Sequence, residues 1–136
     1  MGLTEEQVEE LPLGIVGIKR TYNVQEMAEL YSAATIFVNP TYSDTLPTVN
    51  IEAQACGTPV ITYRTGGCPE TIEDGKTGVV VMRGDKCCMK NMILEVLNTW
   101  DFENVAKYCR ERAITLYDKK DNFKEYLELY SEMLNK

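Results

Sequence analysis

Two carboxylates and the loop around them are the residues in this 136-residue chain whose types and spacing are best suited to chemistry. Asp44 and Glu52 lie eight residues apart, where the sequence predicts a junction between a loop and a helix. The first backbone N–H groups of a helix are unpaired and carry about half a positive charge, so a phosphate binds there without a Lys or Arg. The carboxylates would then accept hydrogen bonds from hydroxyl groups. A phosphate and a polyol side by side are what a nucleotide-sugar presents.

The elements that must position these residues follow from hydrophobic patterning. Helix signals are an Asn23 cap with Glu26 three residues later, Pro47 at the first helical position, Gly57 just past the end, and an Asp85 cap. The pattern predicts strands at residues 13–18, 35–38, 59–63 and 79–82. It predicts helices at residues 24–33, 47–56, 85–100 and from 103 onward with a break near 118–122, and a short helical turn at 69–73.

Strands that alternate with helices indicate the α/β class, with a parallel sheet flanked by helices and right-handed crossovers. In open sheets of this class, ligands bind beyond the carboxyl ends of the strands. The loops at residues 39–46 and 64–70 both follow such ends. We therefore expect them to line one cleft.

The composition narrows the function further. A formal charge of −7 argues against nucleic acid or an anionic membrane surface as the main partner. Without a spanning segment or an export signal, the expected location is cytoplasmic. Five cysteines without a Cys-x-x-Cys pair, in a chain that has no His, favour reduced thiols and no metal site. Cys56 and Cys68 are expected to be packing residues.

Five pieces of sequence, in matching order and spacing, carry a resemblance to a known family: residues 34–40, 44–53, 55–61, 66–70 and 74–78. They resemble the C-terminal lobe of group 1 (family 4) glycosyltransferases, particularly bacterial members of polysaccharide biosynthesis. Those are retaining enzymes of the GT-B fold, which has two Rossmann-like lobes. The resemblance implies a partial Rossmann-like GT-B C-terminal lobe with extra helices at its C-terminal end.

The resemblance also implies a role for each matching residue. Asp44 and Glu52 fall on the family's pair of acids, with Asp where relatives have Glu at the first position. Asp44 thereby takes the catalytic place next to the transferred sugar, and Glu52 takes the place of the acceptor for the ribose hydroxyls. The other donor-binding matches are the backbone amides of Thr45, Leu46 and Thr48, which would hold the diphosphate, and Gly66, Gly67 and Glu70 in the second loop.

The implied reaction is transfer of a hexose from a UDP- or GDP-linked sugar to a polysaccharide or lipid-linked acceptor, without a cofactor or metal. Residues 1–136 would form a single, truncated nucleotide-sugar-binding lobe that begins at about the third strand–helix unit, with the acceptor-binding N-terminal lobe absent. We expect this chain to be inactive alone. The full enzyme would associate peripherally with the inner face of the membrane.

The truncation predicts consequences for the sheet. In the doubly wound order, two missing strands lie between the strand at 13–18 and the strand at 35–38. One outcome is that the strand at 13–18 shifts to pair with the strand at 35–38. Another is that the domain associates with itself or with the missing lobe through exposed sheet edges. The third is that the domain is only marginally stable.

Purely structural roles are open to the same residues. Glu52 as a solvated helix residue, Asp44 as a helix N-cap and Gly66–Gly67 as a left-handed turn are the structural alternatives. Tyr117, Tyr126 and Tyr130 in the tail are expected to form a helix face that packs on the sheet. A non-catalytic nucleotide-sugar-binding or regulatory module is the alternative function. A receiver-like domain is disfavoured because the strand ends lack its acidic cluster.

Overall fold

A three-stranded parallel sheet forms the centre of the computed structural model, which describes residues 2–135. Its spatial order is β1-β2-β3, and both pairings are parallel. The register places Asn39 beside Thr62 and Tyr63 beside Val81, so the carboxyl ends of the strands share one edge. The predicted parallel α/β sheet is confirmed. The strands are β1 (Phe37–Asn39), β2 (Val60–Tyr63) and β3 (Gly78–Val81).

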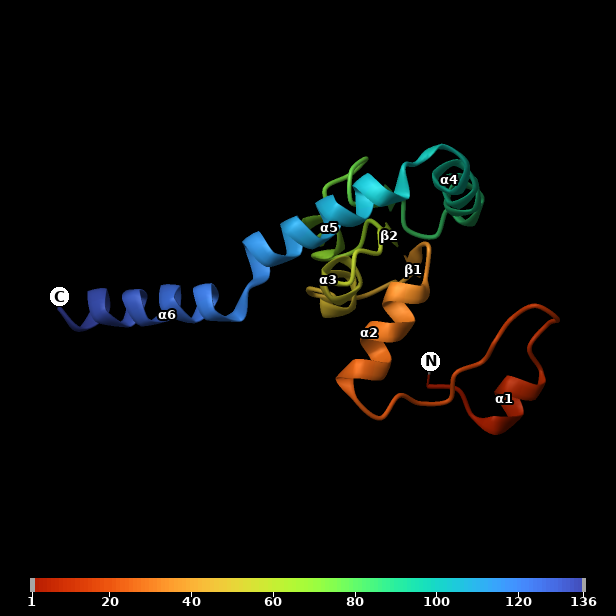
Figure 1. Ribbon diagram of the computed structural model, residues 1–136, viewed down its shortest axis with the longest axis horizontal. Helices are drawn as coiled ribbons and strands as arrows, with labels where there is room; N and C mark the ends of the chain where they lie inside the picture. The colour runs from red at the N-terminus through yellow and green to blue at the C-terminus, as the bar shows by residue number, and fades with distance from the viewer. Residues whose placement is uncertain (1, 136) are drawn as a thin grey trace.

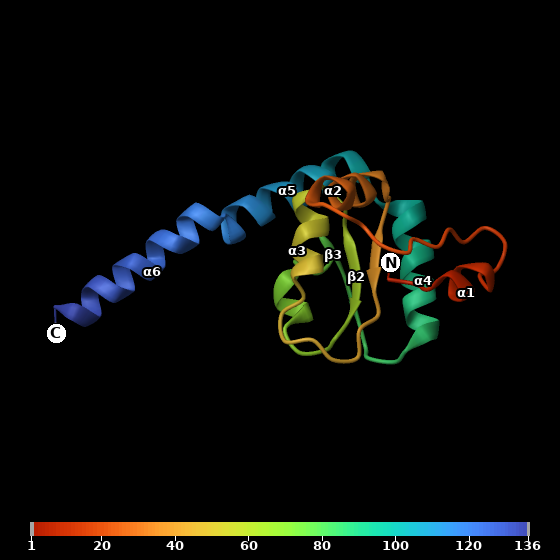
Figure 2. The same ribbon diagram turned by 90° about the horizontal axis from the view of Figure 1, so that it is seen from below.

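Helices cover both faces of this sheet. Helix α3 (Thr48–Ala55) lies on one face and α4 (Lys86–Thr99) lies on the other (Figure 2). Because successive side chains of a strand point to opposite faces, Val60 and Ile61 of the fully buried β2 belong to different apolar clusters. The first cluster contains Tyr31, Ala53, Val60 and Ile72, and the second contains Ile61, Tyr63, Val81, Met89 and Val96.

The predicted helix caps form as expected. The Asn23 side chain accepts a hydrogen bond from Glu26 N at 2.9 Å and starts α2 (Val24–Ala33). Asp85 accepts one from Cys88 N at 2.8 Å and starts α4. Pro47 occupies the N-cap position of α3, so this helix begins at Thr48, one residue later than predicted. A short 3-10 helix, η1 (Cys68–Thr71), stands where the sequence predicted a helical turn.

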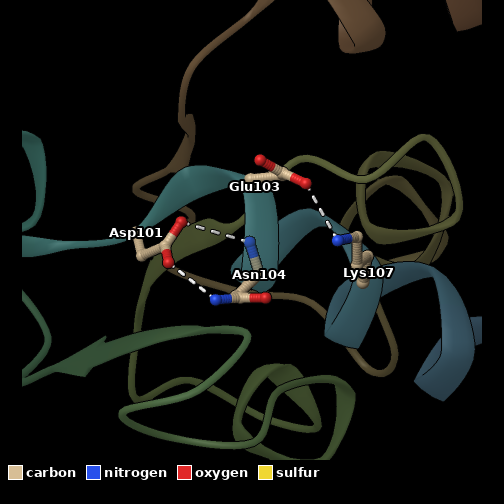
Figure 3. Close-up of polar contacts among 4 residues, drawn as sticks. All are labelled: Asp101, Glu103, Asn104 and Lys107. Carbon is tan, nitrogen blue, oxygen red and sulfur yellow. Dashed lines mark hydrogen bonds and ion pairs between the residues drawn. The ribbon is translucent and has the colours of Figure 1, made fainter.

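Helix α5 (Phe102–Tyr117) starts at an Asp101 cap directly after α4 (Figure 3). The Asp101 carboxylate accepts from Asn104 N at 3.3 Å and from Asn104 Nδ2 at 2.6 Å. One turn on, Lys107 Nζ lies 2.9 Å from Glu103 Oε1. The helix then packs on α3 and buries Cys109, and this burial raises the pKa of the Cys109 thiol to about 12.

Helix α6 (Lys119–Leu134) projects away from the rest of the molecule (Figures 1 and 2). Asp118, which is extended with ψ 125°, separates it from α5 and caps its first turn. Tyr126 and Tyr130 are each 59% exposed, so the expectation that they pack on the sheet is wrong. Of the three tail tyrosines, Tyr117 at the end of α5 reaches the body of the domain.

The N-terminal segment differs from its prediction. It contains a short helix, α1 (Glu5–Glu9), but residues 13–18 form no strand, and Leu13 is fully exposed. The segment folds on itself: Gly2 N donates to Lys19 O at 3.0 Å, and Gly17 lies against the side chains of Val8 and Leu11.

The physical reason for this difference lies in the sheet. A strand with apolar residues on both faces is stable only where a neighbouring strand and covering helices receive it. Within residues 2–135, β1 pairs on one side only, with β2. The predicted shift of residues 13–18 onto β1 is therefore wrong, and self-association stays a prediction. No helix in the described part of the chain is both long and apolar enough to cross a bilayer.

Candidate functional site

The two loops that the sequence singled out meet at the carboxyl edge of the sheet. Gly67 N donates a hydrogen bond to Thr45 O at 2.9 Å. A Cβ added to Gly66 would lie 1.8 Å from Asp44 O, and one added to Gly67 would lie 2.2 Å from Thr45 O. Gly66 also has a φ of +47°, whereas Gly67 has a φ of −83°. Left-handed backbone therefore explains only the first glycine, and the close approach of the two loops requires both.

The first loop leads directly into helix α3, whose N-terminus faces the same edge. Pro47 provides no side-chain cap, and no acceptor among the described residues pairs with the backbone N–H groups of Thr45, Leu46 and Thr48. All three residues are exposed. Asp44, which is half-buried, lies three residues before the N-cap position, so the alternative in which Asp44 is the cap is wrong. Open amides at a helix start form a site for an anion.

A buried hydrogen-bond network holds this edge together. Asn39 Nδ2 donates to Asn50 Oδ1 at 2.9 Å, and Asn50 Nδ2 donates to Thr71 Oγ1 at 3.0 Å. Gln54 Nε2 adds a bond of 2.7 Å to Thr71 O. Asn50 is fully buried, and the network connects the end of β1, helix α3 and η1. Sequence reasoning missed it, although Asn50 and Gln54, one helical turn apart on the inner face of α3, were a visible signal.

Glu52 lies on α3, one turn from the helix start, and is exposed. The Tyr31 hydroxyl lies 3.4 Å from Glu52 Oε2 and donates to it. Burial, together with the charge of Glu52, raises the Tyr31 pKa to about 12. Between α2 and α3, a groove of about 360 Å³ opens beside the carboxylate; its lining, mostly apolar, is Val24, Met27, Ala28, Tyr31, Glu52, Ala55 and Cys56. No local sequence pattern indicates this contact, because the two residues are 21 positions apart.

Glu70, the last predicted site residue, is exposed at the second loop. Its carbonyl oxygen accepts from Arg112 Nη2 at 2.9 Å and from Tyr117 OH at 3.4 Å. Both donors come from α5, more than forty residues further along the chain. Helix α5 thus anchors the second loop, a role that no local sequence pattern announces.

Two basic residues stand at the same edge. Arg64 follows β2 and Arg83 lies two residues after β3, and both are exposed. Arg64 N donates to Val81 O at 2.7 Å, which fixes its backbone where β2 ends. The site therefore combines open amides, an exposed carboxylate and positive charge. The predicted residues fall into three places: Asp44 and Thr45 touch Gly66 and Gly67, Glu52 faces the groove, and Glu70 contacts α5.

Comparison with known proteins shows the family of this chain. Residues 2–99 match the family described as glycosyl transferases group 1. The chain belongs to this family. Over 135 residues it is 30% identical to alpha-maltose-1-phosphate synthase from Mycolicibacterium smegmatis, an alignment that covers 94% of this chain and 35% of the synthase. This group 1 glycosyltransferase chain thus spans about a third of the length of that relative.

Solved structures give the same fold. Sucrose-phosphate synthase from Thermosynechococcus elongatus matches with a TM-score of 0.74 and 32% identity, over 82% of this chain and 28% of the synthase chain. The Anabaena protein HepE in complex with UDP matches with a TM-score of 0.72 over 76% of this chain and 29% of its own. At 22% identity, the second likeness concerns the fold alone. This glycosyltransferase chain has the fold of part of a GT-B enzyme.

Proposed function

We propose that this chain forms a donor-binding half-site of a retaining glycosyltransferase, which transfers a hexose from a UDP- or GDP-linked sugar without a metal or other cofactor. The observation that carries the proposal is the junction of the two loops at Thr45 O and Gly67 N, next to the open amides at the start of α3. A nucleotide-sugar contains a diphosphate between two polyols. This edge offers groups for each of these parts.

The donor would lie along the carboxyl edge of the sheet and into the groove. Its diphosphate would accept hydrogen bonds from the amides of Thr45, Leu46 and Thr48, while Arg64 adds positive charge. Its ribose hydroxyls would donate to Glu52. The apolar groove beside Glu52 suits the flat face of a nucleobase. The UDP complex of HepE, which shares the fold, supports this class of ligand.

The chemistry required of this half is stabilisation of the departing nucleoside diphosphate. Fixed N–H dipoles act on charge that develops during the reaction, and they need no rearrangement when it appears. The network around Asn50 keeps the amides in place, because the buried Asn50 side chain is hydrogen-bonded through both its Oδ1 and its Nδ2. Asp44 would contact the transferred sugar, and Gly66, Gly67 and Glu70 would form the second wall.

The acceptor would be bound outside this chain, since alignment with the maltose-1-phosphate synthase covers only 35% of that enzyme. We propose a polysaccharide or lipid-linked acceptor, and a cytoplasmic enzyme that contacts the membrane only peripherally. The names of two relatives describe phosphorylated disaccharides as products. Joining this chain to a separately expressed acceptor lobe and assaying transfer to each acceptor class distinguishes these possibilities.

Titration of the chain with UDP, GDP and their hexose conjugates tests the donor site. We expect saturable binding that Glu52→Gln weakens roughly 10-fold or more, because hydrogen bonds to a charged group contribute about 1.5–3 kcal/mol. Glu128→Gln on the projecting helix α6 is the matched control and should bind like the original chain. Absence of binding by the folded chain, or equal binding by both variants, would refute the proposal.

A further inference from the structure

We propose that Tyr31 is a positioning residue for Glu52: its hydroxyl holds the carboxylate in the orientation that receives the ribose hydroxyls. This inference rests on the proposed donor-binding function and adds a residue to it. The contact that carries it joins Tyr31 OH to Glu52 Oε2 at 3.4 Å, across the groove between α2 and α3. The two residues are 21 positions apart in the sequence.

Tyr31 is held firmly enough to act as a fixed donor. Its residue is only 4% exposed, and its ring meets the Phe37 ring edge-on, with centroids 5.3 Å apart and planes at 87°. Its backbone carbonyl accepts a hydrogen bond from Thr58 Oγ1 at 2.6 Å. Phe37 of β1 therefore packs on the phenol ring, and Thr58, in the turn before β2, holds the backbone that carries it.

Glu52, by contrast, has an exposed side chain with several torsions. Within residues 2–135, Tyr31 provides the hydrogen bond that reaches its carboxylate. Restricting one oxygen leaves Oε1 and the remaining lone pair of Oε2 available, because each carboxylate oxygen accepts two hydrogen bonds. A diol that approaches from the groove then meets an acceptor that is already oriented, which lowers the entropic cost of binding.

The protonation state of Tyr31 suits this role. Burial first, and then the negative charge of Glu52, raise its pKa to about 12. The phenol consequently remains a neutral donor throughout the neutral and moderately alkaline range. The acceptor is a carboxylate oxygen, and the separation of 3.4 Å is longer than the roughly 2.5–3.0 Å of a usual O–H···O bond, so the contact orients Glu52 without occupying it fully.

The test compares Tyr31→Phe with the original chain in titrations with UDP and with its 2′-deoxy and 3′-deoxy analogues. Phe keeps the ring that packs on Phe37 and removes only the hydroxyl. We expect the UDP dissociation constant to rise about 3- to 10-fold, the usual size of one hydrogen-bond effect. The deoxy analogues should change less than about 2-fold. In a Glu52→Gln background, Tyr31→Phe should have no further effect.

Tyr108→Phe, which removes an exposed phenol from α5, is the matched control and should leave all dissociation constants unchanged. Chemical denaturation of each variant confirms that it is folded. If UDP binding depends on Glu52 but is the same in the Tyr31→Phe variant as in the original chain, the positioning role is wrong and the donor site stands. An equal loss for UDP and for the deoxy analogues likewise overturns it. If the original chain binds no nucleotide, the donor site itself is refuted, and the positioning role with it.

Discussion

At the residue scale, Gly66 decides whether the loops at residues 39–46 and 64–70 can meet. Its Cα lies so near the Asp44 carbonyl that any added Cβ would overlap the oxygen, at 1.8 Å. The contact is with backbone, which cannot move aside as the end of a flexible side chain can. A side chain at Gly66 must therefore move one loop away from the other, and with it the amides of Thr45 and Leu46.

Gly66→Ala should destabilise the chain and abolish nucleotide binding. The steric overlap adds roughly 1–3 kcal/mol to a cost of about 1–2 kcal/mol for Ala at positive φ. Gly75→Ala is the matched control, because Gly75 also has positive φ, +81°, but has open space around its Cβ position. Urea denaturation measures both variants. Similar losses of stability in the two would show that the loop contact is unimportant.

At the element scale, α3 joins the sheet, η1 and α5, and the Asn50 network is its polar attachment. Strand β1, helix α3 and η1 each donate or accept in that network. The connection explains how a 3-residue strand and a single 3-10 turn hold a defined position. Helix α5 adds the second attachment through Arg112, on the carbonyl of Glu70.

Asn50→Ala should lower the free energy of unfolding by about 2–4 kcal/mol, because it removes both side-chain hydrogen bonds of a fully buried amide and takes this partner from the half-buried Asn39 side chain. Asn98→Ala removes an exposed amide that donates to Leu94 O on α4, and should change stability by less than about 0.5 kcal/mol. Guanidinium denaturation compares the two variants. If the two variants lose the same free energy of unfolding, the network does not stabilise this edge of the sheet.

At the scale of the whole molecule, the domain and α6 are nearly separate bodies. Helix α6 contains no buried residue among those described, and its apolar side chains face outward. One group of them follows helical spacing along a single face: Phe123, Tyr126, Leu127, Tyr130, Met133 and Leu134. Among the described residues, the outer edge of β1 has no partner strand either, and it is a second unpaired surface. Such surfaces favour association between molecules.

Truncation after Asp118 should therefore leave the stability of the remaining domain within about 0.5 kcal/mol of the original. It should also reduce self-association. The helical circular dichroism signal should fall by the share that α6 contributes, while the denaturation midpoint stays constant. Sedimentation velocity of both chains measures association. A large fall in the midpoint would show that α6 supports the fold, contrary to its exposure.

How much of this molecule the sequence predicts depends on the range of the interactions involved. The caps at Asn23 and Asp85 act over three residues, so their signals are local and the predicted helices are correct. The apolar runs of β2 and β3 are also local. The predicted strand at 13–18 is wrong because its apolar pattern indicates only that these residues favour burial. A strand also needs a neighbouring strand to pair with, and a local pattern does not provide one. The predicted packing of Tyr126 and Tyr130 is wrong for the same reason.

The chemical types at the site belong to the sequence alone: the two acids, the double glycine and the open helix start are present in the order that the family shares. The tertiary structure decided which of them meet. Backbone contact at Gly66 and Gly67, the reach of Arg112 to Glu70 and that of Tyr31 to Glu52 join residues 21 to 42 positions apart. Such contacts exist only once packing has brought helices and loops together, because no local propensity encodes a distance between separate elements.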